Sequence, residues 1–147
     1  MNIRATRSAV ATAVCLCLVM VVRASGQAPT YDTSRPVTMT GRVATVVLQY
    51  TDRTFLLLDV EAAPGNTERW VIEGMGATEL GWTPRNLPLK LGETVSVSVF
   101  RPRPGTNLVA VVPGDHPALQ EIAKAGRLAR GLDLTFADGR KLVLGSR

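Results

Sequence analysis

Alternation of apolar and polar residues with a period of two is the feature that most limits what this chain can fold into. It is clearest over Thr94 to Phe100, where Val95, Val97 and Val99 alternate with threonine and serine. Successive side chains of a β-strand point to opposite faces, so this pattern predicts a strand with one face in a core and the other in water. Glycine and proline recur between such segments, which favours many short strands joined by turns.

Six further segments either alternate in the same way or are apolar runs too short for a helix. We expect strands at Val37 to Leu48, Phe55 to Val60, Trp70 to Ile72, Leu108 to Val112, Leu132 to Phe136 and Lys141 to Leu144. A Pro-Gly-Asn turn predicts that the second and third of these pair as a hairpin. An Asp-Gly turn predicts a terminal hairpin from the last two.

Two segments depart from the strand pattern. Between Gly74 and Pro88 the glycines and prolines exclude a long helix, so we expect a compact crossover there. After Asp115, apolar residues recur at helical spacing until Gly126. This pattern predicts a short amphipathic helix that Asp115 caps and Gly126 ends.

Together these elements predict an all-β fold with one short helix. We expect a small antiparallel β-barrel of the oligonucleotide/oligosaccharide-binding (OB) type, or a barrel-like sandwich, with a C-terminal hairpin. The predicted domain is single and spans residues 37–147, with a helical insertion at about 115–126. A polar, irregular leader over residues 27–36 precedes it.

Residues 1–26 have the features of a signal peptide. Arg4 and Arg7 precede an apolar run from Ala9 to Val22, and the small residues Ala24-Ser25-Gly26 follow it. The run is shorter than the roughly 20 residues that a helix needs to cross a bilayer, which favours a cleaved signal over a retained anchor. We therefore expect an exported protein, periplasmic or extracellular, with no transmembrane segment after cleavage.

Removal of this signal changes the charge and the cysteine count. The full chain carries a net charge of +5, but three arginines and no acid lie in residues 1–26, so about +2 remains. That balance is too mild to indicate nucleic acid as a partner. Arg53, Arg101 and Arg103 lie in predicted turns, where solubility explains them and an anionic partner is the alternative. Cys15 and Cys17 both lie in the apolar run, so the domain has no disulfide.

The residue types of common catalytic and metal sites are scarce. His116 is the only histidine, and its place at the predicted helix start accounts for it. One histidine without a cysteine supplies neither a transition-metal ligand set nor the base of a Ser-His or Cys-His nucleophile. We expect no metal and no cofactor, and we recognise no catalytic residue. Glu73 and Glu79 flank the crossover, where surface or hydrogen-bonding roles are favoured over acid/base work.

Trp70 and Trp82 bracket the crossover, and burial in the core is the simpler interpretation of both. A sharper hypothesis is that Trp82, together with Glu73, Glu79 and Arg85, lines a ligand-binding groove. Loops on a rigid sheet often carry function, and an aromatic ring beside polar groups suits sugars or peptides.

Several segments together resemble a known family. They are Thr40 to Val43, Leu56 to Val60, Trp70 to Gly74, Leu80 to Trp82, Leu91 to Val95 and Ala137 to Arg140. The chain resembles the exported bacterial proteins grouped as domain-of-unknown-function family 6152 over most of its length after the signal. The resemblance implies no activity, because none is established for that family.

Two departures from the family pattern concern possible sites. Members begin after the signal with paired histidines and carry Asn-Pro-His between the first two strands. Here the leader has no histidine, and Thr51-Asp52-Arg53 stands in place of the tripeptide. If those histidines bind a metal in the family, this chain lacks them. Residues 113–126 also look like an insertion relative to the family.

No residue cluster in the sequence specifies a reaction. We expect a non-enzymatic, exported envelope module that binds a small ligand, a glycan or a protein partner. One alternative is an enzyme of unrecognised type that uses Glu73 or Glu79. Another is an interaction protein that docks by strand addition at an exposed sheet edge.

Overall fold

The computed structural model describes residues 30–49 and 52–146. The predicted signal peptide and residues 27–29 of the leader lie outside this described part. Within it, no helix has the length and apolar character that a bilayer crossing requires.

The described chain contains six strands, two α-helices and one 3-10 helix. In order they are β1 (Val37–Leu48), β2 (Arg53–Ala63), β3 (Asn66–Met75), α1 (Ala77–Leu80), β4 (Thr94–Phe100), η1 (Leu108–Ala110), α2 (Pro117–Lys124), β5 (Leu128–Phe136) and β6 (Lys141–Val143).

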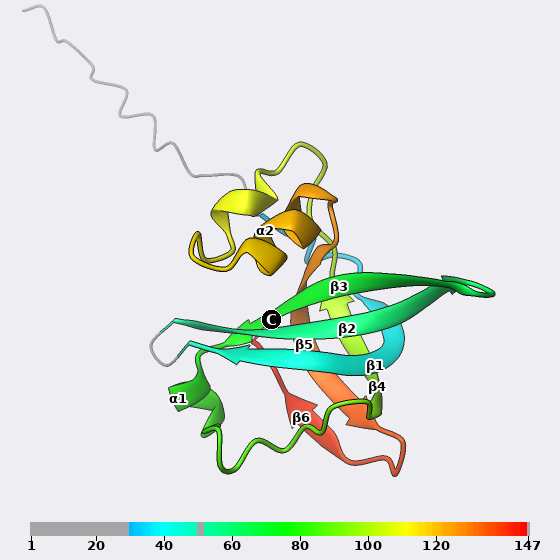
Figure 1. Ribbon diagram of the computed structural model, residues 1–147, viewed down its shortest axis with the longest axis vertical. Helices are drawn as coiled ribbons and strands as arrows, with labels where there is room; N and C mark the ends of the chain where they lie inside the picture. Colours follow the sequence, from blue (N-terminus) through cyan, green and yellow to red (C-terminus); the bar gives the residue numbers. More distant parts are fainter. Residues whose placement is uncertain (1–29, 50–51, 147) are drawn as a thin grey trace, which may run out of the picture.

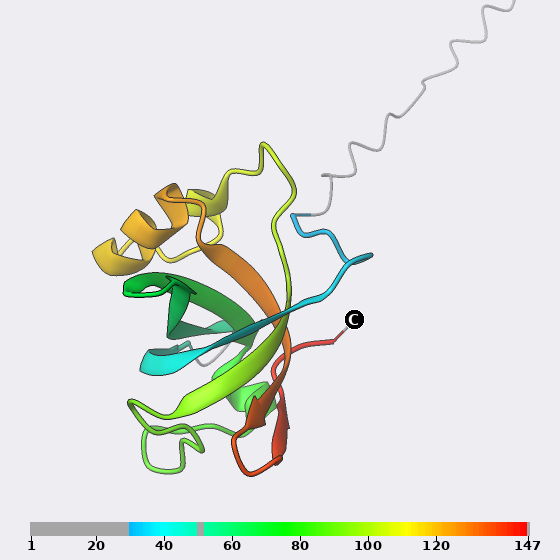
Figure 2. The ribbon, with the colours of Figure 1, turned by 90° about the vertical axis from the view of Figure 1, so that its right-hand side faces the viewer.

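Strands β1 to β5 close into a barrel (Figures 1 and 2). β1 pairs antiparallel with β2 and β4, β2 pairs with β3, and β4 pairs with β5. A parallel pairing of β3 with β5 completes the ring. The predicted small β-barrel is therefore confirmed, with one parallel pair that residue periodicity does not reveal. β6 pairs with β5 outside the ring and forms the predicted terminal hairpin.

The barrel interior holds the larger core. One face of β4 lies in the core, as the alternation predicted, because Val95, Val97 and Val99 are all buried. They pack with inward-facing residues of the other strands and with Trp82 and Leu89 of the crossover. Burial of these side chains is the main source of stability for a chain of this size.

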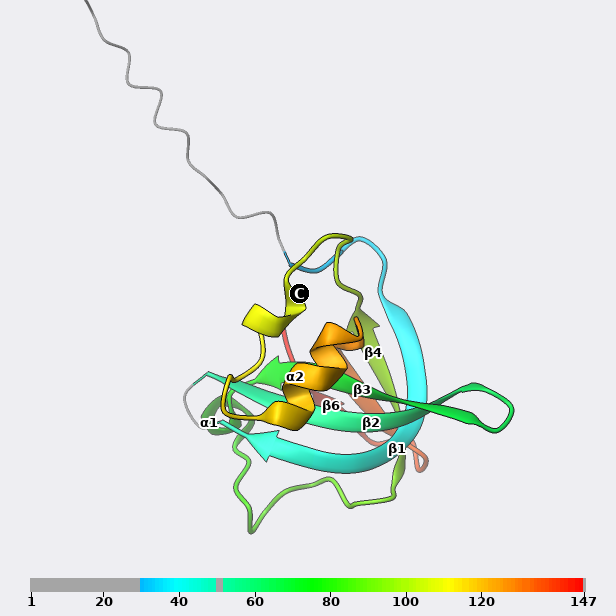
Figure 3. The same ribbon diagram turned by 45° about the horizontal axis from the view of Figure 1, so that its top comes forward.

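A second apolar cluster lies outside the barrel, over β2 and β3. Figure 3 shows α2 crossing this outer face. Phe55, Leu57 and Val71 point outward there and are covered by Leu108 of η1 and Leu119 of α2. The prediction of a strand over residues 108–112 was wrong. The segment forms a 3-10 turn because it helps to cover this apolar face, whereas the fifth barrel strand comes from residues 128–136.

The predicted cap of α2 was also wrong. His116, not Asp115, is the residue at the N-cap position, and its side chain makes no capping hydrogen bond. Pro117, the first residue of the helix, has no backbone N–H, so the helix start has one donor fewer to satisfy. Gln120 instead anchors the segment, because its amide Nε2 donates to the carbonyl oxygens of Val112 at 3.3 Å and Pro113 at 3.1 Å. Gly126, with a φ of 76°, ends the helix as predicted.

Candidate functional site

The described part of the leader, residues 30–36, docks against the connection that follows β4. Tyr31 forms an isolated antiparallel bridge with Pro102, and the backbone N–H of Arg103 donates to the carbonyl of Thr30 at 2.9 Å. The Tyr31 ring is buried against Phe100 and Leu132. Residues 30–36 contain no helix or strand, but Tyr31 belongs to the packed structure ahead of the first strand.

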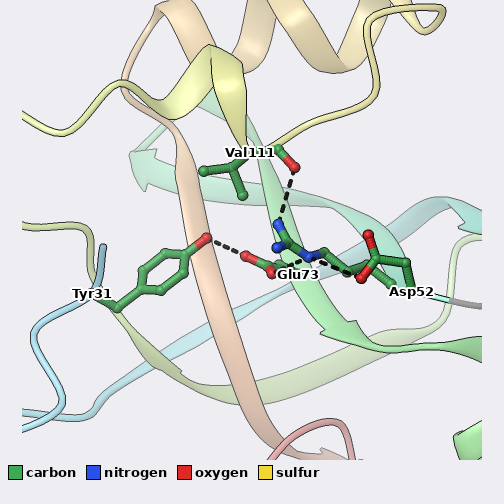
Figure 4. A network of polar contacts seen from close by, with 5 residues as sticks. Tyr31, Asp52, Glu73 and Val111 are labelled. Carbon is green, nitrogen blue, oxygen red and sulfur yellow. Dashed lines mark hydrogen bonds and ion pairs between the residues drawn. The ribbon is translucent and has the colours of Figure 1, made fainter. Parts of the chain in front are cut away.

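Tyr31 leads to a buried polar network on the outer face of the barrel (Figure 4). Its hydroxyl donates a hydrogen bond to Oε2 of Glu73, and Oε1 of Glu73 lies 3.1 Å from Nε of Arg53. Arg53 also donates from Nη1 to the carbonyl of Val111 at 3.2 Å. Asp52 approaches the same guanidinium at 3.7 Å, from the side opposite Tyr31. Both oxygens of the Glu73 carboxylate are therefore occupied by groups of the protein.

The environment keeps the Tyr31 phenol protonated. Burial is the main cause that raises its pKa far above the ordinary value, and the negative charge of Glu73 adds to this. The positive charges of Arg53 and Arg130 act in the opposite direction and are smaller in effect. Tyr31 consequently remains a hydrogen-bond donor to Glu73 at every physiological pH.

Two adjoining hollows, of about 640 and 290 Å³, open beside this network. Arg53, Glu73 and Arg130 line both, and we call the combined space the Glu73 cleft. The larger hollow is bounded by the leader and by residues 106–111, and the smaller one by Asp52, Glu79 and residues 144–146. Volumes of this order accommodate small ligands.

Arg130 is the arginine of the cleft that has no ion-pair partner among the described residues. It stands opposite Glu73 in the parallel register of β3 and β5, and its side chain is half-buried. Among the described residues it forms neither an ion pair nor a side-chain hydrogen bond. Arg53 already pairs with Glu73, so Arg130 is a guanidinium on the cleft wall that forms no ion pair with a described carboxylate, although Asp52 and Glu79 line the smaller hollow with it.

The structure separates the four residues of the groove predicted from the sequence. Glu73 and Glu79 both line the smaller hollow. Trp82 is 6% exposed and belongs to the barrel core, as the simpler interpretation had it. Arg85 is exposed on the crossover and lines neither hollow of the cleft.

Sequence reasoning missed two residues of the cleft, Tyr31 and Arg130. It noted Arg53 only as a turn arginine, whereas Arg53 is the first residue of β2. A tyrosine in an otherwise polar leader was the available signal for Tyr31, since an aromatic ring gains from burial. Nothing in the sequence marks Arg130, because its position depends on the parallel pairing of β3 with β5. In residues 30–49 and 52–146, no three His, Cys, Asp or Glu side chains are grouped so that they could hold a metal ion.

Comparison with known proteins identifies the family. The model of one family matches residues 14–110, which is more than half of the chain. The chain belongs to DUF6152, a family of unknown function. The resemblance noted in the sequence is thus confirmed. The DUF6152 match contains Tyr31, Arg53 and Glu73 but ends before α2 and β5. No curated protein and no solved structure matches the chain.

Two segments that are distant in the sequence meet at Glu73. Tyr31 comes from the leader and Arg53 from the first position of β2, and both residues contact Glu73. They are therefore neighbours in space, although 22 positions separate them in the printed sequence.

Proposed function

We propose that this DUF6152 protein is an exported, non-enzymatic binding module whose Glu73 cleft takes a compact ligand with an anionic group. The ligand is a small molecule, or the acidic end of a peptide or glycan fragment. The observation that carries the proposal is the half-buried Arg130, which forms no ion pair with a described residue, in a cleft where the one buried carboxylate already has its partners.

The charge of the ligand is inferred from Arg130. A guanidinium that is partly removed from water loses hydration, and a carboxylate restores the lost interactions through charge-assisted hydrogen bonds. To reach Glu73, a cationic ligand would have to displace Arg53 or Tyr31. An anionic group bound to Arg130 leaves that network intact.

The size of the ligand is inferred from α2. The strand order of the ring favours an OB-like barrel, and OB barrels bind extended chains on the face of the second and third strands and on the adjoining loops. In this protein the apolar contacts of Leu108 and Leu119 cover the middle of that face, and its Arg53–Glu73 end stays open. This cover favours a compact ligand over a long oligonucleotide or glycan.

A binding role is favoured over catalysis by Glu73. A general acid or base must exchange a proton with the substrate within hydrogen-bonding reach. Both Glu73 oxygens instead face Tyr31 and Arg53, as in a carboxylate that holds a structure together. Glu79 is exposed and lies at the rim.

The test is a ligand titration with paired probes. Short peptides and glycan fragments that carry a carboxylate are compared with their amidated forms, which differ only in charge, and binding is measured by calorimetry and by the shift in melting temperature. We expect the carboxylate forms to bind, and Arg130→Gln to weaken binding about tenfold or more. Arg85→Gln removes the same charge outside the cleft and is the matched control.

Two results would contradict this function. One is equal binding of the acidic and amidated probes, because Arg130 would then not select the ligand. The other is an equal loss in the Arg85 and Arg130 variants, which would indicate only a general charge effect. Export is tested separately by N-terminal sequencing of protein recovered from outside the cytoplasm, which should start near Gln27.

A further inference from the structure

A further hollow lies between the leader and the connection that follows β4, and it shares no lining residue with the Glu73 cleft. It measures about 540 Å³ and is lined by Asp32, Arg35, Val37, Arg101, Pro102, Arg103 and Pro104. We call it the arginine hollow. Three of these seven residues are arginines and one is an acid, so the lining carries a local charge of about +2 in a domain whose total is also about +2.

The single acid offsets only part of the charge of the three arginines, because Asp32 attracts Arg103 and Arg35 without forming an ion pair with either. Asp32 accepts hydrogen bonds from the backbone N–H of Ser34 at 3.0 Å and from its hydroxyl at 2.6 Å. Across the described residues, Arg35, Arg101 and Arg103 form no ion pair. Three guanidinium groups around one hollow repel one another, and an anion bound among them would remove that repulsion.

Local contacts hold two of the three arginines in place. Nε of Arg103 donates to the carbonyl of Tyr31 at 3.3 Å, and the guanidinium of Arg101 lies over the Trp70 ring, 5.4 Å from its centroid. Pro102 and Pro104 restrict the backbone between and after them. Because little freedom remains to be lost, an anion can bind here at a reduced entropic cost.

We propose that the arginine hollow binds a phosphate group, either of a free phosphate ester or of a lipid headgroup. A free phosphate monoester is a dianion that matches the local charge of about +2, and the phosphodiester of a lipid headgroup offsets one of these charges. Arginine donates paired N–H groups that fit the phosphate oxygens of either. Val37, Pro102 and Pro104 provide an apolar border for the organic part of an ester. This site is independent of the Glu73 cleft and of the function proposed for it.

The experiment uses Trp70 as the reporter. Trp70 is half-buried beneath Arg101, whereas Trp82, the other tryptophan, is buried in the core. The protein is titrated at near-physiological salt with glycerol phosphate, and separately with vesicles of phosphatidylglycerol or of neutral phosphatidylcholine. Tryptophan emission and melting temperature are both recorded, and Trp70→Phe should abolish the emission change while the melting shift remains.

The decisive variant is Arg35→Gln, because the Arg35 side chain is exposed and makes no hydrogen bond or ion pair with the described residues, so its loss does not disturb folding. We expect affinity for phosphate to fall about tenfold or more, while Arg85→Gln and Arg130→Gln bind as the unaltered protein does. Saturation by glycerol phosphate identifies a free ester as sufficient. Binding to phosphatidylglycerol vesicles alone identifies the headgroup as the source.

Three outcomes would overturn the proposal. The first is no response to either phosphate source. The second is an equal loss in the Arg35 and Arg85 variants, which would reveal only net charge. The third is a loss that follows Arg130 rather than Arg35, which would place the anion in the Glu73 cleft.

Discussion

The phenol of Tyr31 donates a hydrogen bond to the carboxylate of Glu73, 42 positions later in the chain. This contact joins a leader without regular secondary structure to the third strand of the barrel. It also closes one side of the Glu73 cleft, since Tyr31 and Glu73 both line its larger hollow. The stability of the leader and the shape of the cleft therefore depend on the same pair.

Replacing Tyr31 with phenylalanine should destabilise the protein by about 1–2 kcal/mol. The ring keeps its contacts with Phe100 and Leu132, but Glu73 loses a donor in a place where water cannot fully replace it. Urea unfolding measures the change. An unchanged midpoint would show that the hydrogen bond does not hold the leader in place.

The same tyrosine predicts a loss of stability in alkali. Its pKa is raised in the folded protein, so its contribution is fully present below the ordinary tyrosine pKa near 10 and declines as the pH rises above that value. Unfolding measured from pH 8 to pH 11 should show this decline in the unaltered protein. The decline should be smaller in Tyr31→Phe, and identical profiles would contradict the assignment.

Glu73→Gln should lower stability by about 1–2 kcal/mol, because it removes the charge that Arg53 faces at 3.1 Å. Glu79→Gln is the matched control and should change stability by less than about 0.5 kcal/mol, since Glu79 is exposed. Thermal and urea unfolding of both variants gives the comparison. If Glu73→Gln kept full stability but lost a measurable turnover, the enzyme alternative would replace the binding function.

Gly41→Ala should destabilise the barrel by about 1–3 kcal/mol. A Cβ at this position would lie 2.5 Å from the backbone oxygen of Asp59 and 2.8 Å from Cγ of Leu58, so β1 and β2 would have to separate. Gly114→Ala is the control, because a Cβ there meets no atom within 4 Å and φ is not positive. Similar unfolding midpoints for the two variants would argue against this close approach of the strands.

Local pattern was sufficient for most of the individual elements. The valines of β4 alternate as a half-buried strand requires, and β4 spans the predicted Thr94–Phe100. Gly126 ends α2, as predicted. In each case the structure of the element depends on residues that are close together in the chain. A short stretch of sequence is therefore enough to predict it.

Local pattern failed where a segment had two ways to bury the same side chains. Leu108 and Val112 suit a strand, yet they complete the apolar cover over β2 and β3 as part of a non-strand segment. Whether this segment forms a strand or an apolar cover depends on Phe55, Leu57 and Val71, which lie far away in the sequence.

By itself the sequence determined a β-rich domain with its strands, turns and one amphipathic helix, because propensity and periodicity act over neighbouring residues. Only the tertiary structure decided that β3 and β5 pair in parallel, which brings Arg130 opposite Glu73. It also decided that the leader folds back, so that Tyr31 reaches Glu73 and three arginines surround one hollow. These placements depend on contacts between distant segments, and such contacts are set by the closure of the barrel as a whole.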